Sequence, residues 1–331
     1  MTTTTAPAGD KPRRDWTATL VDRGPFLVAC AMLIALVAVY GSLQRGVFTL
    51  EELNIDSAAA MTLLLAATGQ TMVLLRGGVD LSIGGMISLG TVLAATQFGD
   101  SLGSVLLWCA IILAIGFGVG ALNGLLITVL RLQPFLVTLA TWSILSGIAL
   151  LILPTDGGRL PSGWMTLGNG SLLGLSTSVW ILILLMLFWL WFRRTRLGIT
   201  IRATGSNEKS AFLSGVSPIR INVVTYGLSA TFAALAALYL TTQTGAGSPT
   251  IGKDYILPSV AASVIGGVSL FGGRGELWGT VIGAFILTII GNLVFVLSVS
   301  SYWQPIVSGV ILLIAVLASS LAERSARRSV A

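Results

Sequence analysis

The chain has 331 residues, of which 54% are hydrophobic and only 10% are charged, and its formal net charge is +6. Soluble domains usually carry about 25% charged residues, so this composition, with a mean hydropathy of +0.91, excludes an ordinary water-soluble domain. There is no histidine, and the two cysteines, Cys30 and Cys109, both fall in apolar stretches. We therefore expect neither a metal site nor a disulfide framework.

Ten apolar stretches follow a polar and basic N-terminal tail, and each approaches the roughly 20 residues that a membrane helix needs. We predict an all-α polytopic integral membrane protein with about ten transmembrane helices. Its parts would be a tail over 1–24, a retained transmembrane domain over 25–322 and a tail over 323–331. The predicted spans are 25–43, 56–75, 82–98, 102–130, 134–153, 178–192, 219–241, 256–271, 277–298 and 303–322.

The distribution of basic residues orients these spans. An even number of spans places both termini on one side, and lysine and arginine favour the cytoplasmic side. With cytoplasmic termini, 16 of the 19 basic residues lie inside, and only Arg45, Arg159 and Lys253 lie outside. The positive net charge is therefore interpreted as a topology signal and not as a sign of nucleic-acid binding.

The stretch "RGGVDLSIGG", which joins the second and third spans, places an acid at an expected cytoplasmic-side turn. The turn residues are Gly77, Gly78, Asp80 and Ser82. Asp80 or Ser82 can cap the third helix, where a negative charge opposes the positive helix end. The alternative is that Asp80 binds substrate or a coupling ion, as ionisable groups inside membrane segments often do. A turn at the membrane edge favours the cap.

A possible internal repeat supports the same preference. Residues 77–92 and 266–281 align without a gap and are identical at eight of sixteen positions, with Ser269 in place of Asp80. If the repeat is genuine, the turn needs a short polar group more than a charge. The alternative is chance similarity between two glycine-rich turns.

Uncharged polar residues recur within the spans. They can hydrogen-bond between helices, at about 1 kcal/mol each, or line a pathway for an uncharged polar solute. For any single residue we prefer the first interpretation, and for the set the second. Trp108, Trp180, Trp189, Trp191 and Trp303 lie near span ends, as interface anchors do. The candidate pathway residues are Gln70, Asn123, Thr138, Thr141, Asn222, Thr225 and Asn292.

The longest basic internal loop, 193–220, contains a predicted short helix. Ser206 or Asn207 can cap its start, Glu208 suits the first turn, and Gly215 can end it with a positive φ. An apolar patch over 211–213 needs a surface to pack against. That surface is either the protein's own helix ends and the lipid, or a cytoplasmic partner.

"ATGSNEKSAFLSGV" resembles the coupling loop of permease subunits in bacterial ABC importers of the ribose, galactose and xylose type. "GGVDLSIGGMISLG" and "VIGGVSLFGGRGELWGTVIGAFIL" match the same family, and the likeness extends from about 48 to 322. The resemblance implies that the loop docks on a separate ATPase subunit. The coupling residues it implies are Gly205, Asn207, Glu208, Ala211, Leu213, Ser214 and Gly215.

The resemblance also implies a second permease copy, an external sugar-binding protein contacting 154–178 and 242–256, and a multi-pass location in the bacterial inner membrane. It implies that ATP and Mg are used by the partner, with no cofactor bound by this chain. In agreement, "GSNEKS" lacks a glycine that a phosphate-binding P-loop needs. Pro258 stands where we expect an acid in the family, so ribose itself is not implied.

Two other classes of membrane protein fit the sequence less well. A stand-alone secondary carrier would drive uptake from a gradient without an ATPase, but no charged relay falls at mid-span. A membrane enzyme would need a reactive cluster of titratable groups, and the sequence offers none. An ATP-driven importer of a monosaccharide or similar small polar solute is the preferred interpretation.

Overall fold

The computed structural model describes residues 16–44 and 46–298, together with 300, 303, 306, 309, 310 and 313. The elements in these ranges are α1 (Trp16–Leu43), α2 (Leu50–Arg76), α3 (Ser82–Gln97), α4 (Leu102–Val129), α5 (Pro134–Ile152), α6 (Ser162–Asn169), β1 (Ser171–Leu172), β2 (Leu175–Ser176), α7 (Thr177–Phe192), α8 (Arg196–Ser206), α9 (Glu208–Leu213), α10 (Pro218–Thr244), α11 (Lys253–Ile265) and α12 (Leu277–Val296).

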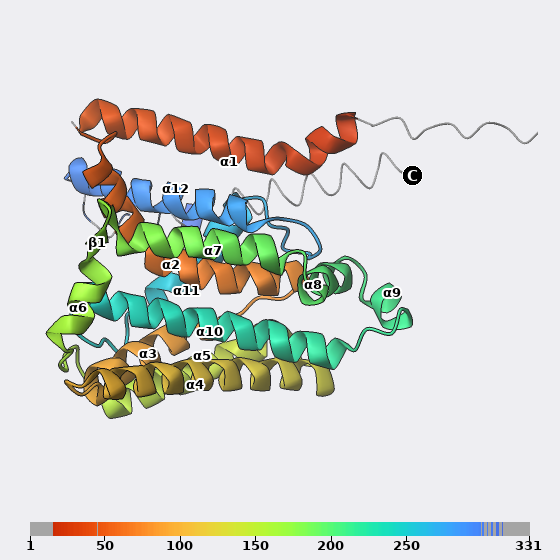
Figure 1. Ribbon diagram of the computed structural model, residues 1–331. Coiled ribbons are helices and arrows are strands. Elements are labelled where there is room, and N and C mark those ends of the chain that lie inside the picture. Colours follow the sequence, from red (N-terminus) through yellow and green to blue (C-terminus); the bar gives the residue numbers. More distant parts are fainter. Residues whose placement is uncertain are drawn as a thin grey trace, which may run out of the picture.

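The long helices lie roughly parallel in one bundle (Figure 1). In the described part of the chain, six helices are long and apolar enough to cross a membrane, or seven if α7 and α8, bent by 73°, form one span. The chain is thus a polytopic helical membrane protein. Each of the first nine predicted stretches contains a helix, whereas the tenth, 303–322, and the C-terminal tail lie mostly or wholly outside the described residues.

The predicted span 256–271 was too long. Helix α11 has 13 residues and ends at Ile265, where Gly266 and Gly267 turn the chain. At 1.5 Å per residue it is about 20 Å long, shorter than a hydrocarbon core of about 30 Å. Residues 266–276 instead form a connection that leads to α12.

Helices α2 and α10 form the centre of the bundle. Their most apolar windows are 89% and 72% buried, against 22% for both α4 and α5 and 11% for α1. The α4–α10 contact depends on small residues, because a Cβ at Gly116, Gly120 or Gly124 would meet backbone oxygens of α10. Small residues allow the two helix backbones to approach closely. In a membrane this packing drives helix association, because lipid tails are as apolar as leucine and supply no hydrophobic driving force.

The two ends of the bundle carry short elements (Figure 1). The stretch 154–178, predicted as a loop, holds α6 and the hairpin of β1 and β2, with Leu172 paired to Leu175. Helix α6 is fixed to the end of α10, since Trp164 Nε1 donates to Thr241 Oγ1 at 3.0 Å. Helices α8 and α9 lie at the opposite end, where they position the candidate site.

Candidate functional site

Helix α9 has the caps that the sequence predicts. Asn207 Oδ1 accepts a hydrogen bond from the Ser210 backbone N–H at 2.9 Å, and Gly215 follows the helix with φ of 84°. Ala211 is buried, whereas Phe212 and Leu213 are 62% and 77% exposed. The short helix therefore faces inward through Ala211 and presents two large apolar side chains outward.

Helix α8 was not predicted as a separate helix. Thr195 caps it by accepting the Gly198 N–H at 3.2 Å, directly after the bend that follows α7. Near its end, Gly205 packs against the end of α2, where an added Cβ would overlap the carbonyl oxygen of Leu75. That same oxygen accepts the Gly273 N–H at 2.8 Å. Gly205 is thus an internal contact between α8, α2 and the connection before α12.

A second contact joins α9 to α2. Arg76, the last residue of α2, lies 3.1 Å from Glu208, the first residue of α9. The arginine side chain is 11% exposed and the glutamate side chain 55% exposed. Exposed ion pairs contribute only about 0–1 kcal/mol, so this pair orients α9 more than it stabilises the fold.

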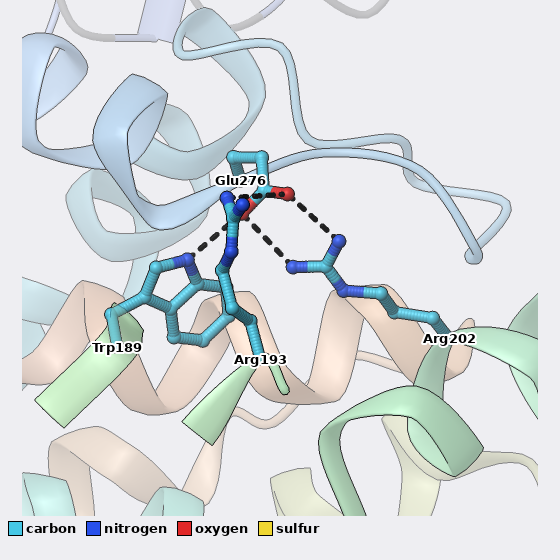
Figure 2. Close-up of polar contacts among 4 residues, drawn as sticks. All are labelled: Trp189, Arg193, Arg202 and Glu276. Carbon is cyan, nitrogen blue, oxygen red and sulfur yellow. Dashed lines mark hydrogen bonds and ion pairs between the residues drawn. The ribbon is translucent and has the colours of Figure 1, made fainter. Parts of the chain in front are cut away.

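Glu276 joins three elements through its carboxylate (Figure 2). Arg202 of α8 donates to both carboxylate oxygens, at 2.8 and 2.9 Å, and Trp189 Nε1 of α7 donates at 2.9 Å. Arg193 lies 3.5 Å away at the bend after α7, and the Arg202 guanidinium stands 5.6 Å from the centre of the Trp189 ring. We call Trp189, Arg193, Arg202 and Glu276 the carboxylate clamp.

The clamp corrects the interpretation of Trp189 as an interface anchor. This tryptophan is fully buried and uses its N–H inside the protein. The sequence indicates the clamp only in part. Glu276 stands out as a rare acid in an apolar chain, but its partners lie 74 to 87 residues earlier in the sequence. Bidentate arginine–carboxylate geometry gives this contact directional specificity.

The charge of Glu276 is stabilised by the clamp. Burial of the carboxyl group raises its pKa, but hydrogen bonds from Arg202 and Trp189, with the positive charges of Arg202 and Arg193, outweigh that effect. The net pKa of Glu276 is lowered from its ordinary value of 4.5. The carboxylate is therefore ionised throughout the physiological range.

A pH dependence follows from this lowered pKa. A group with a lowered folded-state pKa stabilises the protein above its unfolded pKa and loses that effect as pH falls through the folded value. We expect the difference in apparent melting temperature between the native protein and Glu276→Gln to be constant above about pH 5.5 and to shrink below the ordinary value of 4.5. Thermal unfolding in detergent at stepped pH measures this, and a difference that grows on acidification would contradict it.

Asp80 is at the centre of a buried polar network. Its Oδ1 accepts from Ser82 N–H at 2.9 Å and from Ser82 Oγ at 2.5 Å, and its Oδ2 accepts from Ser229 Oγ at 2.8 Å. Asn123 donates to Ser82 Oγ at 3.1 Å and accepts from Thr141 at 2.6 Å. Helices α3, α4, α5 and α10 meet at this network.

The predicted capping chemistry of Asp80 is present, and the carboxylate is buried among the helices. Asp80 accepts the first free N–H of α3, although the N-cap residue itself is Leu81, which makes no side-chain cap. The carboxylate is 1% exposed and contacts Ser229, eleven residues after the start of α10. It lies about 16 Å along that helix, inside the bundle and not at its edge. Such non-helical backbone is tolerated because protein surrounds it.

The turns that begin the two similar segments, 77–92 and 266–281, are shifted by one residue relative to the gapless alignment. Gly77 and Gly267 both have positive φ, near 88°, and their N–H groups donate three residues back, to Leu74 and Val264. The gapless alignment pairs Gly77 with Gly266 instead. Asp80 and Ser269, which the gapless alignment does pair, each accept the backbone N–H two residues later. The turns share their capping chemistry, but only the first leads directly into a helix.

The predicted pathway residues fall into two groups. Five have protein partners: besides Asn123 and Thr141, Thr138 donates to Pro134 O, Asn222 to Thr128 and Asn292 to Asp56. The side chains of the other two, Gln70 and Thr225, are fully buried, and their polar atoms have no hydrogen-bond partner within the described residues. Buried polar groups without partners are rare and call for an explanation.

Comparisons with known proteins agree with this architecture. A family model described as the permease component of the branched-chain amino acid transport system matches residues 57–316. The ribose import permease protein RbsC of Escherichia coli strain K12 is 36% identical over 294 residues, which cover 86% of this chain and 90% of that protein. The ribose permease of Bacillus subtilis strain 168 is 37% identical, with coverage of 81% and 85%.

The autoinducer 2 import permease LsrC of Yersinia enterocolitica is 31% identical and is matched over 86% of this chain and 79% of that protein. No solved structure gives a significant match. A family match over most of the chain, with relatives above 30% identity along nearly their full length, favours an importer subunit over a stand-alone carrier. The chain therefore belongs to the branched-chain-type permease family, as a non-enzymatic membrane subunit of an ABC importer.

Proposed function

We propose that this chain forms the translocation pathway for a monosaccharide or a similar small polar solute in the bacterial cytoplasmic membrane. A second permease subunit would complete the pathway, and an external binding protein would deliver the solute. The end with α8 and α9 would face the cytoplasm, together with both termini. ATP and Mg would be used by a separate ATPase subunit docked there.

The observation that carries this proposal is the outward face of α9. Phe212 and Leu213 are exposed at the end of the bundle, beyond the long helices, in a segment with a negative and a positive residue at its start, Glu208 and Lys209 (Figure 1). Large apolar side chains with a polar rim are typical of protein interfaces. The buried contacts of Gly205 and Ala211 hold this face in place.

The character of the solute follows from the bundle interior. The hydrogen-bonding groups there are mainly hydroxyls and amides, and the side chains of Gln70 and Thr225 find no hydrogen-bond partner in the described part of the chain. Groups of this kind bind sugars through hydrogen bonds that form and break readily. The relatives named for import of ribose and of autoinducer 2 support a small polar solute.

Docking can be tested by placing a charge on the exposed face of α9. We expect Phe212→Asp with Leu213→Asp to reduce the ATPase recovered with the permease at least tenfold, because two apolar contacts of about 1 kcal/mol or more are lost. Co-purification from membranes containing equal amounts of permease measures this.

The matched control is Leu173→Asp, an 85% exposed leucine in the hairpin connection at the opposite end of the bundle. Its ATPase recovery should equal that of the native protein. Undiminished recovery with both α9 changes present would rule out docking through this face.

A further inference from the structure

We infer that the carboxylate clamp transmits the movement of α8 and α9 to α12 and α7, with Glu276 as the positioning residue. This inference rests on the proposed docking of an ATPase at α9. The clamp would be a second route for this movement, beside the contact between α8 and α2. It would also give a role to four side chains that docking alone does not use.

The first step is that Glu276 precedes a membrane helix directly. It is the N-cap residue of α12, so a force on its side chain acts on the backbone directly before the first turn of a 20-residue helix. Leu277 is fully buried and Gly279 packs against the backbone of Gly266, which leaves little freedom between the clamp and the helix.

The second step is that α8 holds Glu276 in two directions. The Arg202 guanidinium contacts both carboxylate oxygens and thereby fixes the distance and the plane of the group, as a single hydrogen bond does not. Trp189 donates from α7, and Arg193 approaches from the bend between α7 and α8 (Figure 2). The carboxylate is thus held by both sides of that bend.

The third step is that the rest of the connection follows the same helix. Gly273 packs against Ser206, and Gly272 lies against the Gly205 carbonyl, at the far end of α8. The connection 269–276 is therefore attached to α8 near Arg202 and again near Ser206. A rotation of α8 about the 73° bend must move the start of α12 or break these contacts.

The experiment uses the complete complex of permease, ATPase and binding protein in liposomes. We expect Glu276→Ala to lower solute uptake per ATP hydrolysed by about tenfold, and Glu276→Gln, which keeps one acceptor oxygen that Trp189 and Arg202 can share, to lower it less. Arg202→Gln should resemble Glu276→Gln. Because the two groups act through one contact, the double variant should be no worse than either single variant.

A spectroscopic readout separates transmission from stability. Spin labels at Leu102 and Phe295, both exposed at the far end of the bundle, report the distance between α4 and α12 in a chain whose two cysteines are replaced. We expect ATP to shift this distance in the otherwise native protein, and the shift to shrink in Glu276→Gln. The control is Glu51→Gln, an exposed acid at the start of α2, with uptake and shift unchanged.

Wild-type uptake per ATP and an unchanged distance shift in the Glu276 variants would overturn the inference. A variant that loses the bound ATPase would also overturn it, because the clamp would then support docking and not transmission. Failure of the docking proposal is seen separately, as an absence of ATPase from the native permease.

Discussion

Gly205→Val is expected to abolish ATP-driven solute uptake while leaving the chain inserted in the membrane. An added Cβ would overlap the carbonyl oxygen of Leu75 at the end of α2 and crowd the Gly273 N–H. Overpacking costs about 1–3 kcal/mol or more where backbone cannot yield. The least costly response is a shift of α8, which carries Phe212 and Leu213 with it. Uptake in liposomes, normalised to inserted permease, measures the loss.

Gly118→Val is the matched control for this change. Gly118 is also a helical glycine, but no atom of another described element lies within 4 Å of its added Cβ, so the new side chain would meet open space. We expect uptake close to that of the native protein. Full activity of Gly205→Val at normal levels would show that the contact between α8 and α2 is not needed.

Asp80→Leu is expected to destabilise the bundle by several kcal/mol and to abolish uptake. The change leaves the Ser82 N–H, the Ser82 hydroxyl and the Ser229 hydroxyl without their acceptor inside the protein. Each buried group left without a partner costs about 1–3 kcal/mol. Thermal unfolding in detergent and uptake in liposomes measure the two effects.

Asp80→Asn should behave differently. Its remaining oxygen can accept from Ser82, and its amide can donate to the Ser229 hydroxyl, so we expect more than half of the native uptake. Glu51→Leu, at an exposed acid, controls for loss of a negative charge. If Asp80→Asn is as inactive as Asp80→Leu in a fully assembled protein, the charge itself is required, and substrate or ion binding replaces capping as its role.

The sequence predicts well the features that depend on residues close together in the chain and on whether a segment prefers lipid or water. Nine apolar stretches contain helices because runs of such residues partition into lipid. The caps of α9 at Asn207 and Gly215 depend on residues within a few positions of each other, so their chemistry is visible in the chain. The family motifs near 77 and 205 are equally local.

Other features depend on which helices meet. The sequence places Asp80 at a turn between two apolar stretches, and only the structure shows that Ser229 and Ser82 hold its carboxylate inside the bundle. Among the polar residues of the spans, the sequence does not distinguish Asn123, which has hydrogen-bond partners, from Gln70, which has none among the residues that the structure describes. Hydrogen bonding of a buried group is decided by its neighbours in space.

By itself the sequence determined a helical membrane permease with an apolar-faced segment between the apolar stretches 178–192 and 219–241. The tertiary structure decided that Trp189 is buried in a clamp and is not an anchor in lipid, and that Glu276 joins α7, α8 and α12. The physical reason is the separation along the chain of the groups involved. Partition into lipid depends on one continuous segment and helix capping on a few adjacent residues. The ion pairs of the clamp join groups that only folding brings together.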